Sequence, residues 1–120
     1  MAQLESPDGR FLYFARETGA RARPLWRQPT NGGDALQVLP DVDPFRYAVG
    51  PDGVYFGSGP DERGVCVIRF LHVASGKLST VLTYSGRPSA GMSVSPDGRW
   101  LLYSYDEQRN ADLMIVENFH

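Results

Sequence analysis

Short apolar runs alternate with turns rich in Gly, Pro, Asp and Asn along the whole chain. The runs are rich in β-branched and aromatic residues, and Gly or Pro interrupts the chain about every ten residues, which favours strands over helices. Some runs are apolar at every position, as in residues 65–68, Val-Cys-Val-Ile. A sheet with one solvated face alternates apolar and polar residues, so such runs indicate sheets that are covered on both faces. The pattern therefore predicts an all-β protein.

A Pro-Asp-Gly turn recurs three times, and an apolar strand follows it each time. Its prolines are Pro7, Pro51 and Pro96, so the turn returns after 44 and then 45 residues. Proline presets φ for the second position of a type I turn, Asp suits the third, and glycine takes the left-handed conformation that closes a bulged hairpin. A period of about 40–50 residues built from short strands is typical of β-propellers.

Further strands recur in the same order between these turns. The predicted strands are 11–14, 24–28, 35–39, 45–49, 54–56, 65–73, 78–84, 91–94, 100–104 and 111–116. If the strands of a blade are named A to D, the chain runs B-C-D, then A-B-C-D, then A-B-C, which is ten strands. The sequence thus predicts an all-β, partial β-propeller of about two and a half four-stranded antiparallel blades. The single domain 1–120 divides into blade pieces of about 1–40, 41–85 and 86–120.

Such an arc cannot close a ring, because propellers close with about four to eight blades. Open blade faces and strand edges favour association. Three arrangements fit: the C-terminal part of a longer propeller, an assembly of copies of this chain, or an open arc. We expect the first.

The pattern Ser-Pro-Asp-Gly-Arg before an apolar strand resembles the TolB-like, WD-repeat-like propellers of bacteria, although the chain has no Trp-Asp dipeptide. Nearly the whole chain resembles the C-terminal propeller region of bacterial winged-helix transcriptional regulators and serine/threonine protein kinases. The matching segments are 5–9, 25–29, 31–33, 68–70, 94–103 and 112–120. The resemblance implies a six-bladed ring that follows a DNA-binding or kinase domain, and it implies no particular site residues. The middle turn departs from the repeat, with Gly50 in place of Ser and Val54 in place of Arg or Lys.

The charge balance argues against a nucleic-acid partner, because twelve Lys and Arg face fourteen Asp and Glu and nucleic-acid binders usually show a basic excess. The densest basic stretch is Arg10, Arg16, Arg21, Arg23 and Arg27. Glu5, Asp8 and Glu17 offset three of these charges, and we expect a solvated strand face. No apolar run approaches the ~18 residues that cross a membrane, and the N-terminus lacks the basic and apolar regions of a signal peptide. We therefore expect no membrane partner for this chain alone. The sequence does not determine the cellular compartment, and it is compatible with an extracytoplasmic parent protein.

The ligand types that bind metals are sparse. Cys66 is the only cysteine, which rules out an internal disulfide, and we expect it to be a small buried hydrophobe. Cys66, His72 and His120 lack the paired spacing of a zinc site, and His72 is expected to lie half-buried at a strand end. Asp41 and Asp43 lack the other ligands of a calcium loop.

Candidate nucleophiles and phosphate loops also fail on spacing. Ser93 in Gly-Met-Ser-Val-Ser is one residue short of a nucleophile elbow and is expected mid-strand. Gly76-Lys77 lacks the upstream glycine of a phosphate loop and predicts a hairpin turn.

The repeated carboxylates are expected to be structural. Asp8, Asp52 and Asp97 should hydrogen-bond nearby backbone in their turns. Two acidic pairs that follow the second strands of successive blades should solvate equivalent loops, with a weak cation or ligand contact as the alternative. These pairs are Asp61-Glu62 and Asp106-Glu107. The sequence therefore predicts no catalytic, cofactor-binding or metal-binding residue, no cofactor and no enzymatic activity.

Three functions fit a propeller without a site motif. The first is a non-catalytic interaction or sensor module, the C-terminal part of a larger signalling or regulatory protein, which binds a protein or small ligand through blade loops. The second is the gating propeller of a prolyl-oligopeptidase-type hydrolase whose catalytic domain lies outside this chain. The third is a self-associating repeat. We expect the first.

Overall fold

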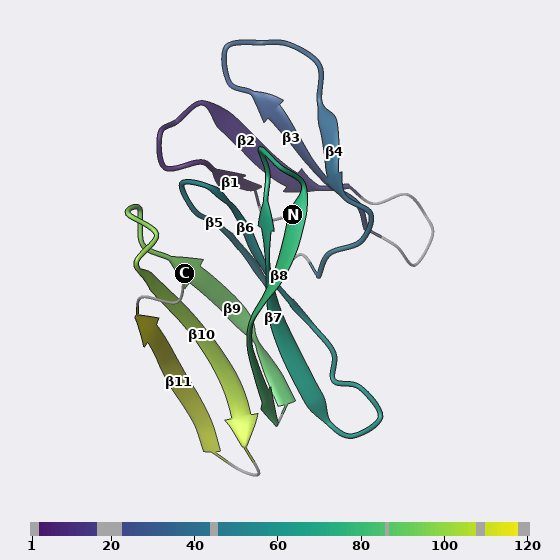
Figure 1. Cartoon of the computed structure of the whole chain (residues 1–120), viewed down its shortest axis with the longest axis vertical. Coiled ribbons are helices and arrows are strands. Elements are labelled where there is room, and N and C mark those ends of the chain that lie inside the picture. The colour runs from purple at the N-terminus through teal and green to yellow at the C-terminus, as the bar shows by residue number, and fades with distance from the viewer. Residues whose placement is uncertain (1–2, 17–22, 44–45, 86, 108–109, 118–120) are drawn as a thin grey trace.

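The computed structural model describes residues 3–16, 23–43, 46–85, 87–107 and 110–117, with side chains except at 87–90 and beyond 103. Its strands are β1 (Gln3–Glu5), β2 (Phe11–Ala15), β3 (Leu25–Pro29), β4 (Leu36–Leu39), β5 (Tyr47–Val49), β6 (Gly53–Ser58), β7 (Val65–His72), β8 (Lys77–Ser85), β9 (Arg87–Val94), β10 (Trp100–Glu107) and β11 (Asn110–Glu117). They form three antiparallel sheets in the orders β1-β2-β3-β4, β5-β6-β7-β8 and β9-β10-β11 (Figure 1). These sheets are blades 1, 2 and 3, and the predicted all-β partial propeller is confirmed. Within the described ranges, no helix could span a membrane.

Blade 1 contains a strand that the sequence pattern did not predict. β1 pairs with β2, with Leu4 opposite Tyr13. Only one of its three residues is apolar, so no alternation marks it as a strand. The described chain therefore has eleven strands instead of the ten expected, and blade 1 is complete.

The last hairpin is longer than predicted. β10 continues to Glu107, where Asp106 lies opposite both Arg87 of β9 and Ala111 of β11. Asp106 and Glu107 are thus strand residues, and their expected place in a loop equivalent to that of Asp61 and Glu62 is wrong. The paired strands on both sides continue the hydrogen-bond ladder past the apolar segment, which the sequence pattern alone does not reveal.

Blade 2 is covered on both faces, as the apolar runs predict. The strand β6 is buried from Gly53 to Gly57. Alternate residues point to opposite faces of a strand, so Val54 and Phe56 pack with Leu71 against blade 1. Tyr55 packs with Ile68 against blade 3.

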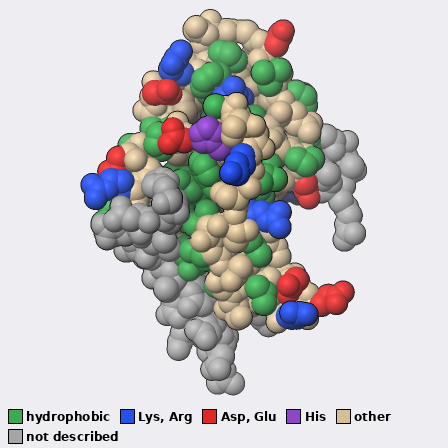
Figure 2. All heavy atoms as spheres, viewed as in Figure 1, with side chains coloured by type: hydrophobic (Ala, Val, Ile, Leu, Met, Phe, Trp, Pro, Cys, Tyr) green, Lys and Arg blue, Asp and Glu red, His purple; other side chains and the backbone are tan. Residues whose placement is uncertain are grey.

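Two separate hydrophobic cores result, one between each pair of neighbouring blades. The core between blades 1 and 2 includes Tyr13, Ala15, Leu25, Leu39, Val42, Tyr47, Val49, Val54, Phe56 and Leu71. The core between blades 2 and 3 includes Tyr55, Ile68, Leu101 and Tyr103, with Phe70, Tyr84 and Val94 against them. Burial raises the pKa of Tyr47 to about 12, so this hydroxyl stays neutral inside its core. Charged side chains gather over the loops, where Figure 2 shows both signs.

Truncation of a core leucine tests this arrangement. Leu25 and Leu101 are fully buried, one in each core, whereas Leu36 is 61% exposed. We expect Leu25→Ala and Leu101→Ala each to lower the free energy of unfolding by about 2–5 kcal/mol, because each leaves a cavity. The same truncation at Leu36 should change it by less than about 0.5 kcal/mol. Urea unfolding followed by circular dichroism measures the free energy of unfolding of all three variants. Equal losses of stability for Leu36→Ala and Leu101→Ala would contradict the assignment of Leu101 to a buried core.

Candidate functional site

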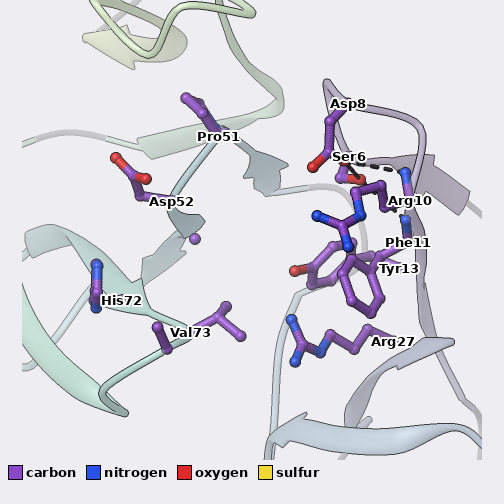
Figure 3. A pocket seen from close by; sticks show the side chains of 13 residues that line it. Ser6, Asp8, Arg10, Phe11, Tyr13, Arg27, Pro51, Asp52, His72 and Val73 are labelled. Atoms are coloured by element: carbon purple, nitrogen blue, oxygen red, sulfur yellow. Dashed lines mark hydrogen bonds between the residues drawn. The ribbon is translucent and has the colours of Figure 1, made fainter. Parts of the chain in front are cut away.

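A pocket of about 370 Å³ opens between blades 1 and 2, at the end that carries the Pro-Asp-Gly turns (Figure 3). We call it the inter-blade groove. Its walls come from the turn 6–10, the turn 50–53 and the hairpin 72–74 that follows β7. Phe11, Tyr13 and Arg27 of blade 1 complete the lining. The volume lies in the range of about 300–1,000 Å³ that is typical of ligand pockets.

The first turn is held by its own side chains. The Asp8 Oδ1 atom accepts hydrogen bonds from the Ser6 hydroxyl (2.6 Å) and from the Arg10 backbone N–H (3.0 Å). The Ser6 Oγ atom accepts in turn from the Phe11 N–H at 3.1 Å. These donors, the Ser6 hydroxyl first, hold the pKa of Asp8 below its ordinary value of 3.8. Gly9 closes the turn at φ 73°, a conformation that L side chains rarely adopt.

The third turn repeats this network atom for atom. The Asp97 Oδ1 atom accepts from the Ser95 hydroxyl (2.6 Å) and from the Arg99 N–H (3.0 Å). The Ser95 Oγ atom accepts from the Trp100 N–H at 3.0 Å. The pKa of Asp97 is lowered for the same reasons, the Ser95 hydrogen bond first. Each of these two carboxylates therefore stabilises its own turn.

The middle turn is different, and the expectation for its carboxylate is wrong. Gly50 carries no hydroxyl, and the Asp52 side chain accepts no hydrogen bond from a described residue. A Cβ atom at Gly50 would lie 3.1 Å from the Tyr55 ring and 3.6 Å from Val94, so serine has little room there. Asp52 lines the inter-blade groove at its exposed rim, with its side chain turned away from the arginines of blade 1 (Figure 3). Burial first, and then the charge of Asp52, raises the pKa of Tyr55 to about 12.

Two arginines form the opposite, blade 1 wall. The Arg27 guanidinium lies 4.3 Å from the centroid of the Phe11 ring, a cation–π contact. The Arg10 guanidinium points into the same space from the turn (Figure 3). Neither guanidinium forms an ion pair with a described residue. Both charges are therefore available to a ligand.

The expected solvated strand face of arginines is not present. Arg16 lies over the rings of Phe14 (5.6 Å) and Trp26 (4.6 Å), which form the other face of blade 1, because they alternate with Tyr13 and Arg27 along the strands. The cluster is thus divided between two faces, and Arg21 lies outside the described residues.

A second pocket of about 310 Å³ continues the inter-blade groove outward along β4. We call it the outer pocket. Its lining is mainly apolar and consists of Arg27, Leu36, Gln37, Val38, Leu71, Val73 and Gly76. Arg27 and Val73 line both pockets. A polar inner part and an apolar outer part therefore share one trough between the two blades.

The loop that carries Asp61 and Glu62 lies at the other end of blade 2. A pocket of about 720 Å³ lies against residues 60–63. The Asp61 Oδ1 atom accepts from the Arg63 N–H (2.8 Å) and from the Val65 N–H (2.9 Å). One carboxylate oxygen of Asp61 thus stabilises its own exposed loop, as expected.

The remaining residues that could coordinate a metal ion lie far from one another. Cys66 is fully buried, and His72 is half-buried at the end of β7, where its Nδ1 lies 2.8 Å from the Ser75 hydroxyl. Six residues of strand separate the two by about 20 Å. The Asp41 carboxylate accepts from the Arg23 N–H at 3.0 Å, and the Asp43 carboxylate lies 3.7 Å from Arg46. No three His, Cys, Asp or Glu residues in the described ranges could hold one metal ion, and His120 lies outside those ranges.

The predicted strand and turn positions of the other two motifs are confirmed. Ser93 lies within β9 opposite Leu102, with no strand-to-helix turn. Gly76 stands at φ 73° in the hairpin between β7 and β8. Neither can act as a nucleophile elbow or a phosphate loop.

Comparison with known proteins identifies the fold. No protein-family model and no curated protein sequence matches the chain. TolB from Acinetobacter baumannii superimposes with a TM-score of 0.69 at 20% identity, over 93% of this chain and 29% of that one. The putative TolB from Agrobacterium tumefaciens gives 0.70 at 20% identity, over 94% and 40%. A puromycin hydrolase reaches only 0.43 at 14% identity, over 96% and 26%.

These similarities show a TolB-like β-propeller fold. The chain spans less than half of either TolB structure. They do not bear on the expected winged-helix or kinase domain, which stays a prediction. The distant puromycin hydrolase similarity carries no argument for a hydrolase.

The turn networks predict a pH-dependent stability. Asp8→Ala and Asp97→Ala should each lower the melting temperature at neutral pH, because the turn loses the acceptor of two hydrogen bonds. Since the folded pKa of each carboxylate lies below 3.8, its contribution is present above that value and is lost as the pH falls through the folded pKa. The difference from the wild type should therefore shrink in acid.

Asp52→Ala is the matched control, since Asp52 holds no such network. Its melting temperature at neutral pH should equal that of the wild type. Differential scanning calorimetry measures all four proteins, and an Asp52→Ala loss as large as that of Asp8→Ala would contradict the difference between the turns.

Proposed function

We propose that this chain is a non-catalytic interaction or sensor module of a larger signalling or regulatory protein, and that it binds a protein or small ligand through the turn-bearing end of its blades. The observation that carries the proposal is the inter-blade groove. Its walls belong to two blades, and the charged groups of Arg10, Arg27 and Asp52 line it without an ion pair to a described residue. Charged groups that the fold leaves unpaired in a concave site are typical of ligand recognition.

The described polar groups of the groove are poorly arranged for covalent chemistry. A nucleophile needs a base within hydrogen-bond reach, and the base needs a third group to orient it. The Ser6 hydroxyl donates to Asp8 and accepts from the Phe11 N–H. The Nδ1 atom of His72 is engaged by Ser75. Binding, and not bond cleavage, is therefore what the groove supports best.

Mapping of bound fragments by NMR tests the proposal. Amide chemical shifts of the labelled 120-residue chain would be followed while a library of small acids, amines and tripeptides is added. The shift changes should gather at residues 6–10, 50–53 and 72–74, because these segments form the groove. Changes confined to residues 60–63 at the opposite end, or none with any compound, would contradict it.

Self-association is a second candidate, which the outer face of blade 1 favours. In the strand pairing, Leu12 and Phe14 occupy the positions in blade 1 that Val54 and Phe56 occupy in blade 2, because Leu12 and Val54 each belong to the ladder pair next to the turn. Val54 and Phe56 are buried against the preceding blade, whereas Leu12 and Phe14 are only half-buried. No described sheet packs on that face. A second copy of this chain, with its own open blade, would cover it.

Sedimentation velocity distinguishes this candidate. If the outer face of blade 1 joins two copies, the wild type should sediment with twice the 13.3 kDa mass of one chain. Phe14→Glu should sediment as a monomer, because dimer formation would bury the new carboxylate in an apolar interface. Leu36→Glu, which alters an exposed residue at the outer pocket, should remain a dimer. A wild type that is monomeric at micromolar concentration would refute self-association.

A further inference from the structure

The two pockets between blades 1 and 2 form one trough with a chemical gradient along it. The inner part, the inter-blade groove, carries Arg10 and Arg27 on one wall. The outer pocket is lined by Leu36, Val38 and Leu71. Because Arg27 and Val73 line both, a single extended ligand can contact both parts.

The blade 1 wall is preorganised for a carboxylate. Arg27 is held over Phe11 at 4.3 Å, which leaves the edge of its planar guanidinium for hydrogen bonds. Asp8, the acid on the same wall, accepts from the Ser6 hydroxyl and the Arg10 N–H at one carboxylate oxygen, and it interacts with Arg10 by charge without an ion pair between described atoms. Two guanidinium groups therefore face the groove without a carboxylate bound to them. Charge-assisted, bidentate bonds to a carboxylate are the strongest that such groups form.

The outer pocket is suited to an aliphatic side chain. Leu36 is 61% exposed and Leu78 is 49% exposed, both unusual for leucine. Register pairs place them beside the trough, with Leu36 opposite Arg27 and Leu78 opposite Leu71. Burial of apolar area here would favour binding by about 25 cal/mol per Å².

The blade 2 wall determines the orientation in which a charged ligand can bind. Asp52 lines the groove on this wall, and no described group donates a hydrogen bond to its carboxylate, so its negative charge repels an acid placed on that side. It can instead accept an N–H of a ligand backbone. An acidic side chain is thereby directed to the arginine wall.

We infer that this trough binds an extended peptide of a partner protein that carries an acidic residue and, two positions on, an aliphatic residue. In an extended chain, residues i and i+2 point the same way about 6.6–7 Å apart, so both side chains enter the trough. The acidic group lies between Arg10 and Arg27, and the aliphatic group enters the outer pocket. The inference rests on the proposed function and names the class of its ligand.

Peptide titration tests it. The probe is an acetylated, amidated octapeptide with Glu-Thr-Leu at its centre, titrated into the labelled chain at millimolar concentration and followed by amide NMR. Companion peptides replace the Glu by Gln or by Lys, or the Leu by Ser. We expect the Glu-Thr-Leu peptide to bind about tenfold more tightly than the Gln peptide, the loss for one charge-assisted hydrogen bond. Added salt should weaken it.

Variants locate the contacts. Arg10→Gln and Arg27→Gln should each reduce affinity for the Glu peptide about tenfold and should bind the Gln peptide as the wild type does. Arg99→Gln is the matched control, because Arg99 holds the Arg10 position in the third turn and does not line the trough. It should bind as the wild type. Leu36→Ala should weaken the Leu peptide and leave the Ser peptide unchanged.

Arg10 is exposed, and the hydrogen bond that it gives to the turn comes from its backbone, with its side chain adding a charge interaction with Asp8. Arg10→Gln is therefore expected to fold even if Arg27→Gln does not. Equal affinity for the Glu and Gln peptides, or arginine variants that bind like Arg99→Gln, would overturn the acidic-peptide inference. In that case other compounds that still perturb residues 6–10 and 50–53 would leave the proposed function standing. If no compound perturbs these residues, both proposals fail.

Discussion

The burial of blade 2 on both faces is the constraint on which the rest of the structure depends. Alternate residues of one strand, Val54 and Tyr55, belong to different hydrophobic cores. Neither core can form unless a neighbouring blade covers that face, so the three sheets stabilise one another by nearest-neighbour contact, as in other repeat proteins. The turn 50–53 starts β6, the strand whose side chains alternate between the two cores.

The same packing produces the candidate site. Tyr55 fills the core between blades 2 and 3 and leaves little room for a side chain at Gly50. Without a serine there, the middle turn lacks the hydroxyl that binds Asp8 and Asp97 in the other two turns. Asp52 is consequently left without a turn hydrogen bond at the rim of the inter-blade groove. A requirement of the core thus converts one copy of a structural carboxylate into a group that can bind a ligand.

The groove illustrates how a repeat protein without a site motif can still recognise a ligand. Arg10 belongs to the first turn and Arg27 to β3, both in blade 1, and Asp52 belongs to the middle turn in blade 2. Each residue is ordinary in its own blade, and only the junction between blades brings them together. The aromatic ring of Phe11 holds one arginine in place, so the site has some rigidity even though part of its lining comes from turns.

The sequence by itself determined the period, the turn type, most strands and the partial propeller, because these depend on local turn chemistry and on alternation within single strands. Turn hydrogen bonds at Asp8 and Asp97 also follow from residues two positions away. The tertiary structure alone decided that β1 forms, that Asp106 and Glu107 lie in a strand, and which carboxylates and arginines face one another. Strand pairing and the stacking of blades join residues that are far apart in sequence. The sequence shows that Gly50 replaces the serine of the other two turns, but only the packing of Tyr55 and Val94 against Gly50 explains why a side chain has little room there.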